Sequence, residues 1–303
     1  MFASFADVAA AFPWFFPLCA LLLGACVGSF LNVVIYRVPA EKSIVTPGSH
    51  CACGQPIKWR DNIPVLSWLL LRGRARCCGQ KFSFRYPFVE LLTAALFVAC
   101  WLHFPPAVAA CGWIFLSCLV AATFIDLDHM IIPDAFTIGG AAAGILLSLL
   151  LPALHGQAGD YFLIASIRSG REALFGLFIG SALVLWIALF AEALLKREAM
   201  GFGDVKYLGA IGTFVGWKGA VFGMFGGAVL GCAWFLLAYL WKKAAGRNAP
   251  AALPAETPEG QPAELGFGVH VPFGPMLGVA ALIYFFRLHP EVDEYFGRLA
   301  ELF

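Results

Sequence analysis

Long apolar segments, separated by short polar stretches, run through most of this chain. A helix needs about 20 consecutive apolar residues to cross the hydrocarbon core of a bilayer. Segments of this kind lie at residues 14–36, 88–104, 107–125, 135–152, 173–195, 219–241 and 269–288, and a shorter, glycine-rich run lies at 205–217. The pattern therefore predicts an all-α polytopic membrane protein with about eight transmembrane helices.

Two polar segments interrupt this pattern. Residues 38–87 form an insert of about fifty residues between the first and second spans. Residues 244–267 carry a proline at every fourth position from Pro250 to Pro262, which excludes a helix and predicts a flexible linker. The expected organisation is a first span at 1–37, the insert at 38–87 and a transmembrane core at 88–303 that contains the linker.

Composition supports a membrane protein. Hydrophobic residues make up 61% of the chain, charged residues make up 13%, and the mean hydropathy is +0.81, whereas an ordinary soluble domain has about 25% charged residues. The net charge is +1, and no nucleic-acid partner is expected. No basic residue precedes Arg37, and the first apolar run is too long for a secretion signal, so we expect it to remain as a membrane helix.

The distribution of basic residues predicts the orientation. If the eight spans alternate in direction, 15 of the 20 Lys and Arg residues fall on one side of the membrane. Loops rich in Lys and Arg normally stay in the cytosol, so this side, which includes the insert, is expected to be cytosolic and both termini to face outward. Asp126 and Asp204 then both lie at cytosolic ends of their spans, which favours one shared site.

These two carboxylates are the candidate chemistry. Ionisable residues bordering membrane spans are costly and mark functional sites, and a pair of carboxyl groups can supply the acid and the base of a hydrolase. Asp126 and Asp128 are two residues apart, so only one of them can face the helix bundle, and spacing does not decide which. Capping of helix ends and an ion or proton pathway are the alternatives to catalysis.

Gly201 and Gly203 stand on either side of Phe202, just before Asp204. Glycines there would allow unusual backbone conformations or the close approach of another helix. We expect them to support the catalytic loop. The alternative is a pair of loop glycines followed by an aspartate that caps a helix.

The insert holds four of the ten cysteines: Cys51, Cys53, Cys77 and Cys78. Disulfides are disfavoured in a reducing compartment, and two close pairs of thiols predict a tetrahedral Zn²⁺ site that would help so small an insert to fold. The spacing is irregular, since one pair has a single intervening residue and the other has none, so a metal-free loop is the alternative. His50 could replace one thiolate.

Several motifs together resemble one family. They are Gly28-Ser-Phe-Leu-Asn-Val-Val-Ile-Tyr-Arg37, Asp61-Asn-Ile-Pro-Val-Leu-Ser-Trp68, Leu71-Arg72-Gly73, Arg85-Tyr-Pro-Phe-Val-Glu90, Asp126 six residues before Ile132-Pro133, Gly201-Phe-Gly-Asp-Val-Lys206 and Pro272-Phe-Gly-Pro275. The chain is similar through these motifs to the bacterial prepilin peptidases, or type IV leader peptidases, which are membrane aspartyl proteases of the Gly-x-Gly-Asp kind.

The resemblance implies an eight-span protein of the bacterial inner membrane. Its implied activity is cleavage of the basic leader from type IV prepilins and secretion pseudopilins on the cytosolic side, followed by N-methylation of the new terminus with S-adenosylmethionine. It also implies that Asp126, rather than Asp128, forms the catalytic dyad with Asp204. The insert departs from the family pattern of two Cys-x-x-Cys pairs, because Ala75 stands where an upstream cysteine would fall.

A membrane transporter or proton channel that uses the two aspartates as a relay is the main alternative. A relay requires carboxylates spread through the depth of the bilayer, whereas the other predicted spans carry almost no charge. A metal-binding membrane scaffold without chemistry is a third possibility.

Overall fold

The computed structural model describes residues 5–157, 159, 161–196, 200–244 and 272–300, and every regular element in these ranges is a helix. The helices are α1 (Phe5–Ala11), α2 (Phe15–Arg37), α3 (Leu66–Leu70), α4 (Arg85–His103), α5 (Pro106–His129), α6 (Asp134–Leu150), α7 (Phe162–Leu195), α8 (Phe202–Ala244), α9 (Gly274–Ile283) and α10 (His289–Ala300). Two short 3-10 turns lie at Trp59–Asp61 and Pro152–His155, and a π-helical turn at Tyr284–Leu288 continues α9.

Five helices are long and apolar enough to cross a membrane: α2, α4, α5, α7 and α8. The apolar helices α6 and α9 with its π-helical turn are shorter. Large apolar side chains on the flanks of the bundle, such as Phe178, Trp186 and Phe190 of α7, are exposed, as expected where lipid is the solvent. The prediction of an all-α membrane protein is confirmed, and the count of eight spans stays a prediction.

Helix α8 contains a reversal that accounts for two of the predicted segments. Gly216 has φ 73° and ψ 177° inside it. A Cβ built on Gly180 of α7 would lie 2.7 Å from the Leu208 carbonyl oxygen and 3.3 Å from Ala220 Cβ, whereas 12 residues of straight helix would separate those two by about 18 Å. The chain therefore folds back at Gly216, and the predicted runs at 205–217 and 219–241 are the two arms of a hairpin.

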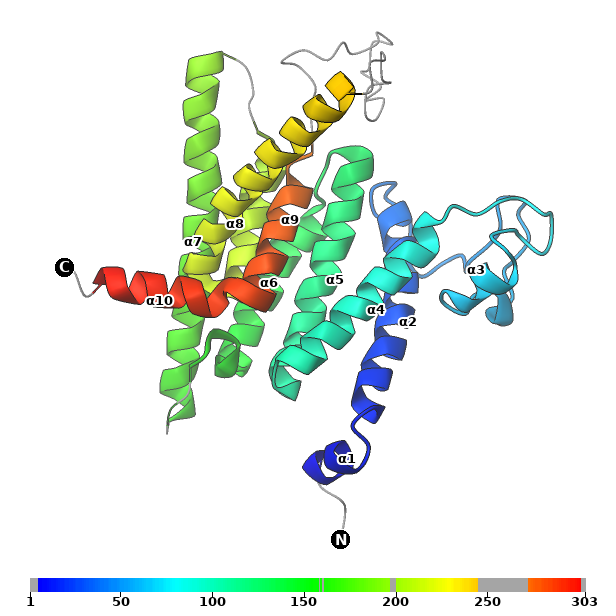
Figure 1. The fold of residues 1–303 in the computed structure, drawn as a ribbon, viewed down its shortest axis with the longest axis horizontal. Helices are drawn as coiled ribbons and strands as arrows, with labels where there is room; N and C mark the ends of the chain where they lie inside the picture. The colour runs from blue at the N-terminus through cyan, green and yellow to red at the C-terminus, as the bar shows by residue number, and fades with distance from the viewer. Residues whose placement is uncertain (1–4, 158, 160, 197–199, 245–271, 301–303) are drawn as a thin grey trace.

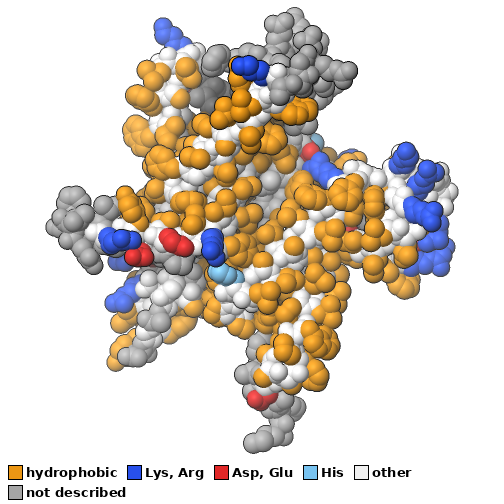
Figure 2. Space-filling model, in the orientation of Figure 1, with side chains coloured by type: hydrophobic (Ala, Val, Ile, Leu, Met, Phe, Trp, Pro, Cys, Tyr) orange, Lys and Arg blue, Asp and Glu red, His pale blue; other side chains and the backbone are white. Residues whose placement is uncertain are grey.

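The helices form one bundle, with α2, α4 and α5 on one side and α7, α8 and α9 on the other (Figure 1). The insert that contains α3 lies outside the bundle, beside the C-terminal end of α2 and the N-terminal end of α4 (Figure 1). Figure 2 shows apolar side chains over the flank of the bundle and Lys and Arg gathered over the insert.

Glycines let neighbouring helices approach closely. A Cβ on Gly176 of α7 would lie 1.9 Å from the carbonyl oxygen of Gly212 in α8, and a Cβ on Gly28 of α2 would lie 2.7 Å from the Cα of Glu90 in α4. Such close backbone contacts are typical of helix association in membranes. There, van der Waals packing of small residues holds helices together, because the hydrophobic effect does not act between helices in lipid. The second contact places α2 directly against the part of α4 that borders the insert.

Most predicted span boundaries agree with the helices to within a few residues. The exception is α7, which begins at Phe162 rather than at the predicted 173, so that Arg168 and Arg171 lie on a helix that extends beyond the apolar segment. Ala244 ends α8, and the rest of the predicted linker 244–267 lies outside the described residues. The division into 1–37, 38–87 and 88–303 stays a prediction.

Candidate active site and metal site

Asp126 lies in the last turn of α5 and is buried, with only 5% of its surface exposed. Met130 adopts a left-handed conformation and donates its N–H to the Asp126 carbonyl oxygen, which ends the helix. The side chain points towards the start of α9, where the Gly274 N–H donates to Asp126 Oδ2 at 3.1 Å. The first N–H groups of a helix have no partner within it and favour anions, so the fold supplies this carboxylate with a backbone donor.

Asp204 lies in the first turn of α8 and is half-buried. Its N–H donates to the Gly201 carbonyl oxygen at 3.1 Å, which closes the first turn of the helix. The carboxylates of Asp126 and Asp204 interact electrostatically. The C-terminal end of α5 and the N-terminal end of α8 thus bring the two predicted site residues to the same end of the bundle.

Ile132 connects the surroundings of both aspartates. It is buried in the segment between α5 and α6, and its Cβ lies 3.6 Å from the position that a Cβ on Gly203 would take. Its Cδ1 lies 3.0 Å from the corresponding position on Gly274. One apolar side chain therefore lies between the start of α8 and the start of α9, beside the carboxylates.

Two basic side chains at this end of the bundle pair with other acids. Arg85 of α4 binds Asp128, and its second nitrogen donates to the Phe124 carbonyl oxygen at 3.2 Å. Lys206 of α8 forms an ion pair with Asp134 at the start of α6. These two ion pairs connect α4 with α5 and α8 with α6 near the site. Asp128 is thereby assigned to helix packing, and of the two aspartates on α5 only Asp126 faces the bundle.

The expected roles of Gly201 and Gly203 change in part. Neither has a positive φ, so no unusual backbone conformation requires them. Gly203 faces the Ile132 segment at an ordinary contact distance, and the position of a Cβ on Gly201 is nearly open. A supporting role of the two glycines in the catalytic loop stays a prediction.

The four insert cysteines converge on one point. Their sulfur atoms all lie within 4.8 Å of one another, with Cys51 Sγ 3.6 Å from Cys78 Sγ and Cys53 Sγ 3.4 Å from Cys77 Sγ. Thiolates bound at about 2.3 Å in a tetrahedral Zn²⁺ site are separated by roughly 3.8 Å. The irregular spacing is therefore compatible with a metal site, and the residues fit zinc.

Two tight turns make this convergence possible. Gly54 and Gly79, each directly after a cysteine pair, have positive φ values of 85° and 71°. The Gly54 N–H donates to the Cys51 carbonyl oxygen and the Gly79 N–H to the Ala75 carbonyl oxygen, each at 2.8 Å. Adjacent cysteines can then both face inward. Ala75 is buried beneath the turn.

Local hydrogen bonds set unequal proton affinities in this cluster. The Cys53 backbone N–H lowers the pKa of Cys51 to about 7, whereas hydrogen bonding to the Cys53 sulfur raises the pKa of Cys77 to about 12. A bound metal would hold all four residues as thiolates, because it displaces their protons. His50 instead directs Nδ1 to the Gly48 carbonyl oxygen at 3.1 Å.

Two features of the Asp126 surroundings were not assigned from sequence. The first is the backbone donor Gly274. It lies in the Pro-Phe-Gly-Pro motif, and a glycine directly before a proline at the start of a helix could have indicated it. Tyr207 and Thr123 both place their hydroxyl groups against Gly278, at 3.3 and 2.9 Å from the position of a Cβ there. Nothing in their spacing along the chain indicated this.

Comparison with known proteins gives matches over most of the chain. Residues 22–104 match the model described as Bacterial Peptidase A24 N-terminal domain, and residues 113–236 match the Type IV leader peptidase family. A prepilin leader peptidase/N-methyltransferase of Myxococcus xanthus is 40% identical, over 72% of this chain and 64% of its own length. No solved structure matches this chain.

Two other relatives are covered more fully. The prepilin leader peptidase/N-methyltransferase of Klebsiella pneumoniae is 40% identical, over 70% of this chain and 90% of its own length. The type 4 prepilin-like proteins leader peptide-processing enzyme of Escherichia coli is 38% identical, over 69% of this chain and 81% of its own length. With these matches, the chain belongs to the type IV leader peptidase family.

Proposed function

We propose that this protein removes the leader peptide from type IV prepilins and N-methylates the new amino terminus. Membership of the family supports both activities, and pseudopilins of secretion systems are the further substrates that we propose. The structural observation that carries the peptidase is a buried carboxylate, Asp126, held by a backbone N–H and interacting with Asp204 at one end of a membrane bundle. The same family membership disfavours a transporter or channel.

In this proposal Asp126 and Asp204 act as a pair that shares one proton. The ionised carboxylate takes a proton from water, and the water oxygen attacks the carbonyl carbon of the scissile amide. The protonated carboxyl gives its proton to the amide nitrogen as the carbon–nitrogen bond breaks. The Gly274 N–H holds the Asp126 carboxylate in place, and Ile132 keeps the surroundings apolar.

The proposed topology has eight crossings in the bacterial inner membrane. They are α2, α4, α5, α6, α7, the two arms of α8, and α9 with its π-helical turn. The excess of Lys and Arg on the side of the insert supports a cytosolic insert and a cytosolic active site. A prepilin carries its basic leader on that side and its apolar helix in the bilayer, so the scissile bond would meet the carboxylates at the membrane surface.

Zn²⁺ bound by Cys51, Cys53, Cys77 and Cys78 is proposed as a structural metal that organises the insert. The insert of residues 38–87 has few buried apolar side chains of its own, so metal binding would supply folding free energy. S-adenosylmethionine is the proposed methyl donor.

Paired variants test the dyad. Asp126→Asn and Asp204→Asn should each abolish prepilin cleavage by purified protein in detergent, because neither variant retains both an acid and a base. Asp128→Asn is the matched control and should retain most of the activity, since its carboxylate binds Arg85. Full cleavage by either Asp126→Asn or Asp204→Asn would exclude the dyad.

The pH dependence of cleavage is a second readout. Two carboxyl groups that share one proton should give a bell-shaped profile whose two limbs belong to the pair. A profile with one limb only would contradict the shared proton.

A further inference from the structure

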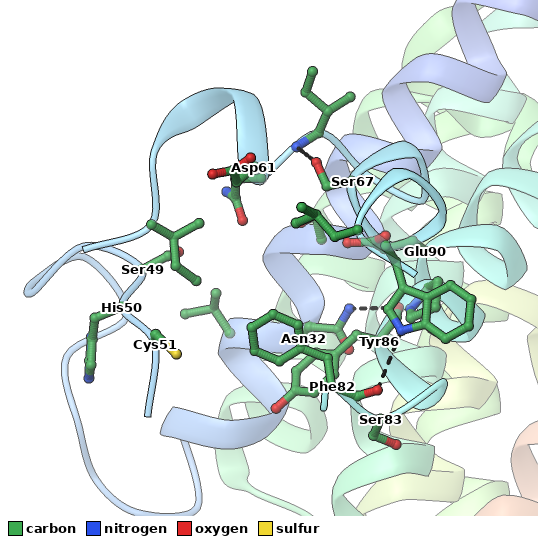
Figure 3. Close-up of a pocket in the computed structure, with 18 of the residues that line it drawn as sticks. Asn32, Ser49, His50, Cys51, Asp61, Ser67, Phe82, Ser83, Tyr86 and Glu90 are labelled. Atoms are coloured by element: carbon green, nitrogen blue, oxygen red, sulfur yellow. Dashed lines mark hydrogen bonds between the residues drawn. The ribbon is translucent and has the colours of Figure 1, made fainter. Parts of the chain in front are cut away.

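A cavity of about 550 Å³ lies between the insert and the ends of α2 and α4. Figure 3 shows the loop of the insert on one side of it and Asn32, Tyr86 and Glu90 from the bundle on the other. Its volume is within the range of about 300–1,000 Å³ that small-molecule sites occupy. The cavity is separate from the proposed dyad, because neither Asp126 nor Asp204 lines it.

Glu90 is the most enclosed acid of this cavity, with 9% of its surface exposed. Its Oε2 accepts a hydrogen bond from the Val65 N–H at 2.7 Å, and the Ser29 hydroxyl also hydrogen-bonds to the carboxylate. Glu90 therefore joins α4, α2 and the insert at one point. A carboxylate in such an enclosed wall attracts a cationic ligand more strongly than one in open water would.

The backbone of Val65, in the same wall, is strained. Its φ is 60° and its ψ is −50°, a region that a β-branched residue rarely occupies and that costs of order 1–3 kcal/mol. The bond to Glu90 and the hydrogen bond from the Ile63 N–H to the Ser67 hydroxyl at 2.9 Å keep this segment in place. Strained backbone of this kind clusters at ligand sites.

The other walls carry complementary groups. Trp68, Phe82 and Tyr86 offer aromatic surface, and the Trp68 indole N–H donates to the Phe82 carbonyl oxygen at 3.5 Å. Arg37 and Lys81 also line the cavity and add positive charge. The cavity thus combines a planar apolar surface, one enclosed negative charge and basic groups, which suits a ligand with an aromatic base, a cationic centre and a carboxylate.

The edge of the cavity is linked to the dyad. Arg85 lies between Ser83 and Tyr86, which both line the cavity, and its guanidinium binds Asp128, two residues after Asp126. A substrate whose apolar helix stays in the bilayer can move its new amino terminus only over a short distance. Both reactions must therefore take place at the same end of the bundle, as the positions of Glu90 and Asp126 allow.

We propose that this cavity is the binding site of the sulfonium methyl donor S-adenosylmethionine, with Glu90 facing its positive charge and the adenine against the aromatic wall. The inference rests on the proposed N-methyltransferase activity. The donor supplies an electrophilic methyl group. The α-ammonium group of the substrate first loses a proton to water at the open side of the cavity. Its nitrogen lone pair then forms a bond to the methyl carbon as the carbon–sulfur bond breaks, and that electron pair stays on sulfur, which becomes a neutral thioether.

Binding of two ligands by the purified full-length protein tests the site. Equilibrium dialysis would measure the affinities of S-adenosylmethionine, which carries the sulfonium charge, and of S-adenosylhomocysteine, which lacks it. Glu90→Gln keeps an acceptor for the Val65 N–H and removes the charge, so it should weaken binding of S-adenosylmethionine about tenfold and that of S-adenosylhomocysteine much less. Glu192→Gln, on α7 and away from the cavity, is the matched control and should change neither affinity.

A second pair of variants tests the aromatic wall. Trp68→Leu should weaken both ligands about tenfold or more, whereas Trp59→Leu should not, because Trp59 lies in the same insert, is 82% exposed and does not line the cavity. Prepilin cleavage reports folding of the bundle, and zinc content reports folding of the insert. If Trp68→Leu loses zinc, Tyr86→Leu replaces it with the same expected loss of affinity.

The outcomes separate this site from the proposed function. If the wild-type protein binds the donor and methylates prepilin while the cavity variants bind as well as the wild type, the site is wrong and the function stands. If the wild-type protein cleaves prepilin but neither binds the donor nor transfers a methyl group, both the methyltransferase activity and this site are wrong.

Discussion

Gly274 offers a direct test of how the proposed dyad is held. Its N–H donates to Asp126 Oδ2 at 3.1 Å, and a Cβ added to it would lie 2.6 Å from that same oxygen and 3.0 Å from Ile132 Cδ1. We expect Gly274→Ala to displace the Asp126 carboxylate while leaving α9 intact. Gly274 does not have a positive φ, but it precedes Pro275, and proline disfavours helical backbone in a preceding residue that carries a Cβ, so thermal unfolding must report any cost to α9.

The size of the effect follows from these contacts. An ordinary van der Waals contact begins at 3.4 Å, so the carboxylate and the new methyl group must separate by about 0.8 Å. A displacement of about 1 Å at a reacting group can lower the rate about 100-fold. We therefore expect kcat to fall by about 30- to 100-fold, or roughly 2–2.7 kcal/mol in the activation free energy. KM should change little, because the substrate contacts are not altered.

The assay is cleavage of a full-length prepilin in detergent, with kcat and KM measured separately and folding checked by gel filtration and thermal unfolding. Gly140→Ala is the matched control, since a Cβ there would meet Ala210 Cβ at an ordinary 3.8 Å. A Gly274→Ala variant that folds and cleaves with the kcat of the wild type would refute the positioning of Asp126 by the start of α9.

Three further predictions concern packing, the metal and a bridge between helices. Gly176→Leu should prevent stable folding, because overpacking against the Gly212 carbonyl costs at least about 1–3 kcal/mol, whereas Gly231→Leu, which meets nothing within 4 Å, should fold normally in a thermal-unfolding assay. Cys51→Ser should lower the zinc content measured by mass spectrometry and reduce methylation while cleavage persists; unchanged zinc would exclude this ligand. Arg85→Gln breaks the bridge to Asp128 and should lower the rate of methylation while changing the affinity for the donor less. Equal methylation rates in the variant and the wild type would contradict a role for the bridge.

Local sequence properties were sufficient for the helices. The apolar segments from 14–36 onwards became helices because each is long enough to satisfy its backbone hydrogen bonds internally and apolar enough to lie in lipid. The start of α7 at Phe162 was missed because the first three turns of this helix include Arg168 and Arg171, and hydropathy marks the membrane-buried part of a helix rather than its end.

Local properties were not sufficient for the site. Asp126 and Asp128 have the same chemistry and differ only in the face of α5 that they occupy, and the packing of α9 against that helix decides which one is buried. The cysteines predicted a metal site despite their irregular spacing, and two left-handed glycines turn both pairs inward.

The sequence by itself thus determined the all-helical membrane class, the candidate aspartates and cysteines, and, through its motifs, the family. Only the tertiary structure decided which groups meet: the Gly274 N–H with a carboxylate 148 residues away, and Glu90 with Val65 across the edge of a cavity. The physical reason is range. Hydropathy and helix formation depend on residues within a few turns of one another, whereas hydrogen bonds between distant segments depend on how whole helices pack.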